Sequence, residues 1–486
     1  MNNNGKEIQI KKEILVRIIE AFYSDDFEEN TRLIPFDMRP KGAEVPYRCC
    51  IHKERAIIKD RTIAGLGFAI EDDDERTTLA TYAKNAMART ELQKGVLTVL
   101  QDACKGCVPS QYYVTDLCQG CVARPCEHSC KFGAVKITEG RSKIDPSKCK
   151  KCGMCMSACP YNAIVKITVP CESACPVGAI SKDETGFAHI NFDRCISCGK
   201  CIMACPFGAV HEKSQIIDIL KALKSDKKVV AMFAPSIAGQ FNGDIYQLKT
   251  ALLQAGFDDV YEVAKGADVT SANEAKEFLE RMEAGQSFMT TSCCAGYNEF
   301  VKKHLPEIKP YVSDTKTPLY YTAEMVKNEI GADTVTVFIS PCVAKRAECF
   351  DNENTDYVMS CEELGALFIA KKIDVGACEK TDYNGESSKQ ARNYGVTGGV
   401  AEAVKKKLPD ESVINPCIIN GLNADSIKQL RKFVSNNACE GGCNIVEVMC
   451  CEGGCIGGNA NLNIQRVAQR KINELLNVSD DEEKLS

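Results

Sequence analysis

The sequence predicts a multidomain protein of mixed α/β and α+β class. It combines a helical N-terminal region, a central region of small cysteine-rich modules and a C-terminal domain of two α/β lobes. Three observations support this prediction. The 30 cysteines are spread unevenly over the 486 residues, and those in the centre repeat at short, fixed spacings. After residue 210, short apolar runs alternate with helical stretches, the pattern of largely parallel sheets.

The overall composition is that of a globular chain, with 44% hydrophobic and 26% charged residues. The net charge of −6 gives no basic field that would attract nucleic acid or an anionic membrane. The sequence contains no run of about 18 apolar residues, the length that a helix needs to span a bilayer. The polar N-terminal stretch does not resemble a signal peptide. We therefore expect a cytoplasmic protein with no nucleic-acid partner and no membrane partner.

Residues 1–103 are expected to form a mostly helical domain of unassigned role. The stretch 74–102 has the composition of a helix, and the only cysteines of the region are Cys49 and Cys50. Adjacent cysteines rarely bind one metal together, so a structural or docking role is favoured for this pair.

Residues 104–210 hold sixteen cysteines and are expected to form a polyferredoxin-like region. Two segments carry the pattern CxxCxxCxxxCP. In this pattern one loop supplies three thiolates to a [4Fe-4S] cluster, and the cysteine before proline binds the neighbouring cluster. Thiolates at such spacings select iron–sulfur clusters or zinc, and the doubled long motif favours iron–sulfur clusters. The cysteines of the two segments are Cys149, Cys152, Cys155 and Cys159, then Cys195, Cys198, Cys201 and Cys205.

The other cysteines of this region follow looser patterns. One repeat contains Cys118, Cys121, Cys126 and Cys130, and it could exchange fourth ligands with the 149–159 segment. Another repeat keeps only Cys171 and Cys175, and an upstream CxxC, Cys104 and Cys107, could complete a further cluster with Cys171 and Cys205. Sixteen cysteines would then hold four clusters; three or two remain if some of Cys104, Cys107 and Cys171 are free. We expect His128 to be a solvent-facing helix residue. A row of clusters would carry single electrons to a buried site.

Residues 211–486 are predicted to form the two α/β lobes. Four apolar runs read as buried strands, at 229–235, 334–340, 417–421 and 444–449, and the stretch 272–284 reads as a helix.

Three motifs follow apolar runs in this region: TTSCCAGYNEF (290–300), FISPCVAKRAE (338–348) and EVMCCEGGCIGG (447–458). Their thiols should therefore meet at strand ends, where open α/β sheets bind ligands. Cys294, Cys342, Cys451 and Cys455 come from separate loops and could hold one cubane cluster in the core. A first CEGGC copy, with Cys439 and Cys443, precedes the last strand. It is expected to lie at the opposite strand end as free thiols or an adventitious metal contact.

With these motifs the chain resembles the [FeFe]-hydrogenases, which carry TSCCPxW, MPCxxKxxE and ExMACxxGCxxGG in this order. The resemblance covers about residues 210–470 for a two-lobed catalytic domain and 140–210 for ferredoxin-like [4Fe-4S] modules. It implies an H-cluster, which is a [4Fe-4S] cubane joined through a cysteine to a di-iron unit with CO, cyanide and a dithiolate bridge. Cys294, Cys342 and Cys451 would hold the cubane, and Cys455 would bridge to the di-iron unit. Three to four further [4Fe-4S] clusters would supply electrons.

The resemblance also implies a set of catalytic residues. Cys293 matches the family's proton carrier, and a thiol there suits proton transfer if its partners lie within hydrogen-bond reach. The relay would continue through Glu274, Glu277, Arg281 and Ser313; without the family pattern the glutamates would read as a solvated helix face. Lys345 would bind a cyanide ligand, while Ser340, Met449 and Cys450 would lie next to the cofactor. Glu348 and Glu447 would orient the motif loops.

The sequence departs from the family motifs at four positions. Ala295 and Tyr297 replace proline and tryptophan, Ser340 replaces methionine and Cys450 replaces alanine. Such changes beside a cluster alter its potential, and they resemble a divergent, group-B-like branch.

The implied function is the reaction 2H⁺ + 2e⁻ ⇌ H₂, with ferredoxin or a similar carrier as the electron partner. Iron–sulfur and H-cluster maturation proteins would be further partners. The alternatives are a non-catalytic, hydrogenase-like iron–sulfur assembly protein and a redox or H₂ sensor. The matching relay residues argue against the assembly protein, and no signalling domain is recognisable.

Overall fold

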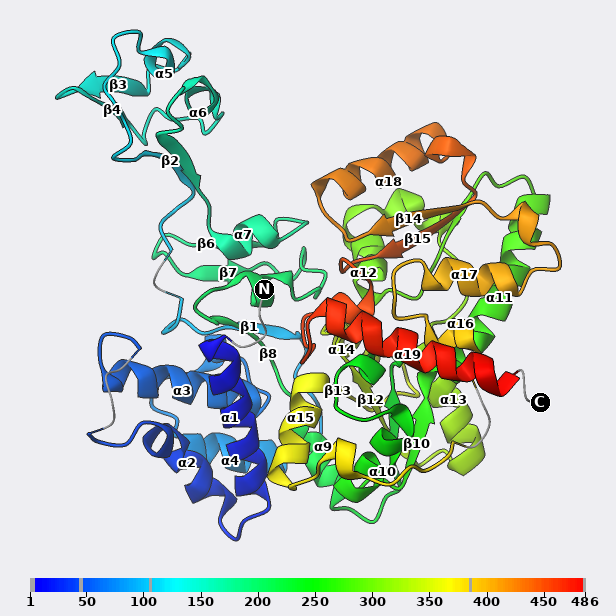
Figure 1. The fold of residues 1–486 in the computed structure, drawn as a ribbon. Coiled ribbons are helices and arrows are strands. Elements are labelled where there is room, and N and C mark those ends of the chain that lie inside the picture. The colour runs from blue at the N-terminus through cyan, green and yellow to red at the C-terminus, as the bar shows by residue number, and fades with distance from the viewer. Residues whose placement is uncertain (1–4, 43–46, 105–106, 384–386, 484–486) are drawn as a thin grey trace.

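The structure is a computed structural model that describes residues 5–42, 47–104, 107–383 and 387–483 (Figure 1). Within these residues an N-terminal group of helices packs beside the cysteine-rich region and a larger α/β region follows. The predicted mixed α/β and α+β class is confirmed. No helix of the described residues is long and apolar enough to cross a bilayer.

The N-terminal helices pack around the apolar face of the first one. In α1, Ile14, Ile18 and Phe22 repeat at helical spacing and are all buried. Cys50 caps the third helix from the residue before it, and its sulfur accepts a hydrogen bond from the amide of Lys53 at 3.5 Å. The elements of this region are α1 (Lys6–Phe22), α2 (Phe27–Met38), α3 (Ile51–Gly65), η1 (Ile70–Asp72) and α4 (Leu79–Ala88).

The expectation of a helix over residues 74–102 is wrong in its second half. The helix ends at Ala88, and residues 97–99 form strand β1 (Leu97–Val99), which pairs antiparallel with β8 (Val210–Glu212). The run Leu-Thr-Val buries all three side chains in this pairing, so a partner more than a hundred residues away decides its conformation.

The cysteine-rich region consists of two modules, one inserted into the other. We call residues 97–107 and 168–212 the outer module and residues 111–167 the inner module. The inner module projects from the body of the molecule, and the chain enters and leaves it through the adjacent strands β2 and β5 (Figure 1). Its elements are β2 (Gln111–Val114), α5 (Pro125–His128), β3 (Val135–Thr138), β4 (Arg141–Ile144), α6 (Met154–Ala158) and β5 (Ile164–Ile167).

The outer module repeats this pattern. In both modules a short helix precedes the cysteine of each Cys-Pro or Cys-Lys step, and a strand follows. Besides β1 and β8, the outer module contains α7 (Pro170–Ala174), β6 (Ile180–Lys182), β7 (Ala188–Ile190) and α8 (Lys200–Ala204).

The first lobe of the C-terminal region is built on a four-stranded parallel sheet in the order β10-β9-β12-β13. Its two central strands are buried along their whole length, as expected for strands covered by helices on both faces. The strands are β9 (Val229–Phe233), β10 (Asp259–Glu262), β12 (Val335–Ser340) and β13 (Tyr357–Ser360). The helices are α9 (Ile216–Leu223), η2 (Pro235–Gly239), α10 (Ile245–Ala255), α13 (Pro318–Ile330), α14 (Lys345–Cys349), α15 (Cys361–Ala370) and η4 (Val375–Ala377).

The second lobe contains a three-stranded parallel sheet in the order β11-β15-β14. The long helix α11 (Val263–Glu283) leads from the first sheet to the second and contains the predicted helix 272–284. The strands are β11 (Met289–Thr290), β14 (Pro416–Asn420) and β15 (Ile445–Met449). The helices are α12 (Ala295–His304), η3 (Pro306–Tyr311), α16 (Lys389–Arg392), α17 (Gly399–Lys406), η5 (Glu411–Val413), α18 (Ala424–Asn436), η6 (Glu440–Gly442), η7 (Cys455–Gly457) and α19 (Gln465–Glu483).

All four strand predictions for this region agree with the structure, because continuous apolar runs between turn residues identify buried parallel strands.

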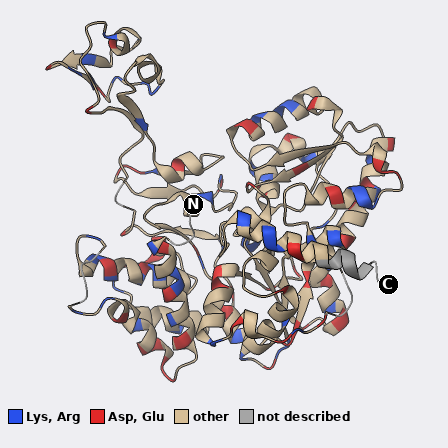
Figure 2. Cartoon of the chain, in the orientation of Figure 1, with Lys and Arg blue, Asp and Glu red and all other residues tan. Residues whose placement is uncertain are grey.

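Charges of both signs lie along the outer helices (Figure 2).

A buried charge network joins the outer module to the first lobe. Arg346 of α14 pairs with Glu363 of α15 at 2.6 Å, and the exposed fractions of the two side chains are 2% and 1%. Arg346 also donates to the carbonyl oxygen of Lys213, and Ser214 donates to Glu363. The residues that follow β8 are thus held by a pair that has no contact with solvent.

We predict that Arg346→Met destabilises the protein by about 3–5 kcal/mol, because Glu363 is left buried without a counter-charge. The measurement is the denaturant midpoint of the C-terminal region, followed by circular dichroism. The control is Lys302→Ala, which removes an ion pair with Asp351 whose side chains are 58% and 67% exposed; it should cost less than about 1 kcal/mol. Equal shifts for the two variants would contradict the prediction.

Candidate active site

Four thiols from three strand ends meet between the two sheets. Cys294 follows β11, Cys342 follows β12, and Cys451 and Cys455 follow β15. Burial raises the pKa of Cys455 to about 12, and the nearby Cys342 and Cys294 add to this by charge repulsion. Burial also raises the pKa of Cys451, with repulsion from the other three. The structure therefore brings the four predicted cubane ligands into one group.

The chemistry of this group fits an iron–sulfur cubane. Buried thiolates repel one another, and iron cations offset that repulsion. The amide of Cys450 donates to the Cys294 sulfur at 3.4 Å, as expected for a ligand that accepts backbone hydrogen bonds. No three donors among the described residues converge on one ion. A cubane does not require such convergence, because each thiolate binds a different iron.

Cys293 precedes Cys294, and both pack against an apolar cluster that includes Met449 and Tyr394. Burial raises the pKa of the Cys293 thiol well above its ordinary value, and Glu274 adds to the shift. A raised pKa favours the protonated form of the Cys293 thiol.

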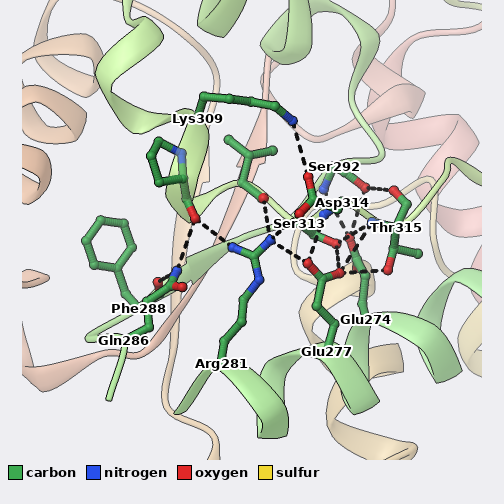
Figure 3. Close-up of polar contacts among 12 residues, drawn as sticks. Glu274, Glu277, Arg281, Gln286, Phe288, Ser292, Lys309, Ser313, Asp314 and Thr315 are labelled. Atoms are coloured by element: carbon green, nitrogen blue, oxygen red, sulfur yellow. Dashed lines mark hydrogen bonds and ion pairs between the residues drawn. The ribbon is translucent and has the colours of Figure 1, made fainter. Parts of the chain in front are cut away.

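A hydrogen-bonded chain runs from Glu274 towards the surface (Figure 3). Glu274 Oε1 accepts from the amide and the hydroxyl of Ser292, both at 3.1 Å. Its other oxygen, Oε2, is buried and accepts no hydrogen bond from the described residues. Ser313 lies between the two glutamates; it donates to Glu277 at 2.6 Å and also lowers the pKa of Glu274.

Glu277 and Arg281 form the outer part of the chain (Figure 3). Arg281 pairs with Glu277 at 2.6 Å and with Asp314 at 2.9 Å, and the Asp314 side chain is 77% exposed. Thr315 donates to Glu277 at 2.8 Å. Ser292, Ser313, Asp314 and Thr315 line a cavity of about 360 Å³ that opens to solvent. The chain thus connects a buried carboxyl group to water.

The two glutamates have opposite pKa shifts. Burial raises the pKa of Glu274 to about 7. Burial acts in the same direction on Glu277, but hydrogen bonds from Ser313, Asp314 and Thr315 and the charge of Arg281 bring its pKa below the ordinary value. A carboxyl group whose pKa lies near 7, next to an ionised carboxylate, can exchange protons at physiological pH.

Lys345 is a buried residue of the site. Its ammonium group pairs with Glu348 at 2.5 Å, and Glu348 also accepts from Thr317 at 2.6 Å. Burial works to lower the pKa of Lys345, but Glu348, Cys342 and Cys293 raise it overall. A charged donor thus lies beside both motif cysteines.

Two further predicted residues orient the motif loops. Ser340 accepts a hydrogen bond from the amide of Cys342 at 3.0 Å. Glu447 is fully buried and accepts from the amides of Gly398 and Ala401 at 2.6 and 2.8 Å.

The cysteines of the outer module form two groups. Burial raises the pKa of Cys171 to about 11, and repulsion from the nearby Cys205 and Cys104 adds to the shift. Cys107 has the same two neighbours. The pKa of Cys201 is instead raised, after burial, by the charges of Cys198, Cys195 and Cys175, and less by that of Cys171. The upstream CxxC therefore lies beside Cys171 and Cys205, the arrangement considered from the sequence.

The inner module is consistent with the same exchange of fourth ligands. Burial raises the pKa of Cys155, and both Cys149 of its own segment and Cys130 of the other repeat add to the shift. Cys126 and Cys159 pack in the same core. His128 is an exposed helix residue, as predicted.

Two residues near the site, and one at the opposite end of the second sheet, were not singled out in the sequence. Tyr394 is buried, its hydroxyl lies 3.5 Å from that of Ser271, and Glu274 and Cys293 are among its charged neighbours. Ser292 precedes the cysteine pair, and its place in the motif could have identified it. Cys417 of β14 contacts Cys443 through its thiol, and Cys443 also contacts Cys439; no local pattern links Cys417 to the first CEGGC copy.

Comparison with known proteins gives matches over most of the chain. Residues 227–459 match the family described as iron only hydrogenase large subunit, C-terminal domain. Residues 142–165 match a 4Fe-4S binding domain, and residues 165–216 match the LdpA Fe-S cluster-binding domain.

Three curated relatives cover different shares of the chain. Iron hydrogenase 1 of Clostridium pasteurianum is 29% identical over 72% of this chain and 71% of its own length. The periplasmic [Fe] hydrogenase large subunit of Nitratidesulfovibrio vulgaris is 30% identical over 65% of this chain and 85% of its own length. The cytosolic Fe-S cluster assembly factor NAR1 of Meyerozyma guilliermondii is 29% identical over 34% of each chain.

We predict that an infrared carbonyl band of a protonated carboxyl group disappears as the pH rises through about 7, because burial raises the pKa of Glu274 to that value. Below this pH the group is protonated and above it the group is ionised. Glu274→Gln should remove the band. Glu277→Gln is the matched control, because a lowered pKa keeps Glu277 ionised and its loss leaves the band in place. Burial also raises the pKa of Asp60 to about 7, so the assignment rests on the difference from the wild-type protein. A titrating band that is no weaker in Glu274→Gln than in the wild type would disprove it.

Proposed function

The chain belongs to the iron-only hydrogenase family, and we propose that it catalyses 2H⁺ + 2e⁻ ⇌ H₂. One observation carries this proposal. The Cys293 thiol lies between the group of four thiols and the buried Glu274, which a polar chain connects to solvent. Holding a cluster alone would not require a proton path that ends beside it.

The cofactor would be held by Cys294, Cys342 and Cys451, with Cys455 as the bridging ligand. When bound, it supplies the redox-active iron at which protons and electrons combine. Lys345 would donate hydrogen bonds to the anionic ligands of this group. Its pKa stays high, so its ammonium group remains charged beside Glu348.

The protein's own residues would move the proton. Cys293 would hold it at sulfur next to the cofactor, and the buried Glu274, whose charge acts on the Cys293 thiol, would exchange the proton with it. Ser313 connects Glu274 with Glu277, and Arg281 keeps Glu277 ionised beside the solvent-filled cavity. In the direction of H₂ formation, each proton would pass from solvent through Glu277, Ser313 and Glu274 to Cys293.

Electrons would reach the site through four [4Fe-4S] clusters, two in each module. The grouping of thiols supports Cys104, Cys107, Cys171 and Cys205 as one ligand set and Cys175, Cys195, Cys198 and Cys201 as another. By the same exchange the inner module would use Cys118, Cys121, Cys126 and Cys159, and Cys130, Cys149, Cys152 and Cys155.

The inner module also supports an acidic ferredoxin as the electron partner. It contains nine Lys and Arg but four Asp and Glu, in a chain whose net charge is −6. Apolar side chains are exposed among these charges: Val122 is 98% exposed, Leu117 61% and Tyr113 54%. A basic surface with an apolar centre attracts and then binds an acidic protein.

The alternative of a non-catalytic assembly protein has less support. The match to an assembly factor covers a third of the chain. An assembly protein would need only the group of four thiols, and the polar relay from Cys293 to Asp314 would then have no function. A cytoplasmic location also stays a prediction.

The proposal is tested by infrared spectroscopy of the protein produced together with the H-cluster maturation proteins. Bands of CO and cyanide ligands are expected, and hydrogen should be formed with a low-potential electron donor. Absence of both bands in protein with a full complement of iron would contradict the function.

We predict that Cys293→Ala lowers hydrogen turnover by about 10²–10⁴-fold, the usual contribution of a positioned acid or base. The CO and cyanide bands should remain, because Cys293 is not a ligand. Cys361→Ala, which removes another buried thiol, should leave turnover unchanged. Unchanged turnover in Cys293→Ala would exclude its role in proton transfer.

We predict that replacing Lys148, Lys150 and Lys151 together by Glu raises the KM for an acidic ferredoxin roughly tenfold at low salt and weakens its salt dependence. Turnover with an uncharged small-molecule donor should not change. Reversal of Lys405, Lys406 and Lys407 is the control, because it makes the same charge change outside the inner module. An equal effect of both triple variants would disprove docking at the inner module.

A further inference from the structure

The segment that carries Cys195 and Cys198 is fixed directly on the catalytic lobes. Lys303 of α12 donates to the carbonyl oxygens of Cys195 and Phe192 at 2.7 and 3.1 Å. On the other side, Lys200 donates to the carbonyl of Leu422 at 2.5 Å, and the Asn459 amide donates to the carbonyl of Cys198. Of the four proposed ligand sets, the one that contains Cys195 and Cys198 therefore lies against the active site.

Cys450 is the residue between the two sets of ligands. It is buried, it immediately precedes Cys451, and its amide donates to the sulfur of Cys294 at 3.4 Å. On the opposite side, its sulfur lies next to Cys198: the Cys450 sulfur and the Cys198 Cβ are both within 4 Å of the position that a Cβ atom at Gly296 would take. One residue thus lies beside ligands of both metal groups.

The packing leaves room for this contact at Gly296. A Cβ atom built there would lie 3.1 Å from the Cys450 sulfur and 3.9 Å from Cys198 Cβ. Any side chain at this position would press on the Cys450 thiol. The close approach of α12, the Cys198 loop and Cys450 therefore depends on a glycine.

The direction of a hydrogen bond between Cys450 and Cys198 follows from the roles of the two sulfurs. A cluster ligand is a thiolate with lone pairs and no proton, so Cys198 can only accept. Cys450 belongs to none of the proposed ligand sets and keeps its proton. A hydrogen bond to a ligand sulfur stabilises the more negative, reduced cluster and raises its reduction potential. The family motif has alanine at this position, which offers no such donor.

We propose that the Cys450 thiol donates a hydrogen bond to the Cys198 sulfur and thereby raises the reduction potential of the cluster next to the active site. Cys450 is a positioning residue: it acts on the cluster through its ligand and does not touch the reacting atoms. The inference rests on the proposed function in one respect, the assignment of Cys198 as a cluster ligand.

The test is a potentiometric titration of the full-length protein followed by electron paramagnetic resonance, on the iron–sulfur-loaded chain without the di-iron unit. Cys450→Ala and Cys450→Val should each lower the midpoint potential of one cluster and leave the others unchanged. Cys450→Ser restores a donor and should return the potential to the wild-type value or above it. Cys361→Ala is the control for loss of a buried thiol and should change no potential.

The outcomes separate a hydrogen bond from simple packing. Unchanged potentials in both apolar variants would overturn the proposal. Loss of one cluster from the apolar variants but not from Cys450→Ser would support it, and loss from all three would overturn it in favour of a steric role. The measurement needs neither the di-iron unit nor turnover, so a failed hydrogen assay would leave its result unaffected.

Discussion

The central constraint on this fold is the convergence of four thiols that repel one another once they ionise. They come from loops that are far apart in the sequence, and each loop begins where a buried parallel strand ends. The carboxyl ends of such strands can meet only if both sheets are held in fixed relative positions. Within the first lobe, the buried Arg346–Glu363 pair joins α14 to α15. In the second lobe, Glu447 of β15 accepts hydrogen bonds from the amides of Gly398 and Ala401.

The same constraint shapes the electrostatics around the thiols. Many of these groups are buried, and a buried charge is costly unless it is compensated nearby. Lys345 is compensated by Glu348, and Glu277 by Arg281 and three hydrogen bonds. Among the described residues, no cation is paired with Glu274, and burial raises its pKa to about 7. Two glutamates one helical turn apart thus acquire different chemistry, because only one of them reaches a positive charge.

Much of this arrangement could be predicted from the sequence, and the reasons for the successes and failures are physical. Buried parallel strands leave a continuous apolar pattern, so the strands and the cysteines that follow them were predictable. The relay required the family pattern, because Glu274 and Glu277 alone resemble any exposed helix face. Strand β1, the contact of Cys417 with Cys443 and the contact of Cys198 with Cys450 were not predictable. Each depends on a partner distant in the sequence, and no local periodicity encodes such a partner.

The insertion of one cysteine-rich module into the other also sets an order of events during synthesis. In the proposed ligand sets, Cys104 and Cys107 leave the ribosome before the inner module, and their partners Cys171 and Cys205 follow only after it. Domains generally fold as units as they emerge, so the inner module could receive its proposed clusters while Cys104 and Cys107 still lack their partners. The proposed cluster that depends most on long-range closure would therefore be completed last among those of the two modules, and it would connect the inner module to the catalytic lobes.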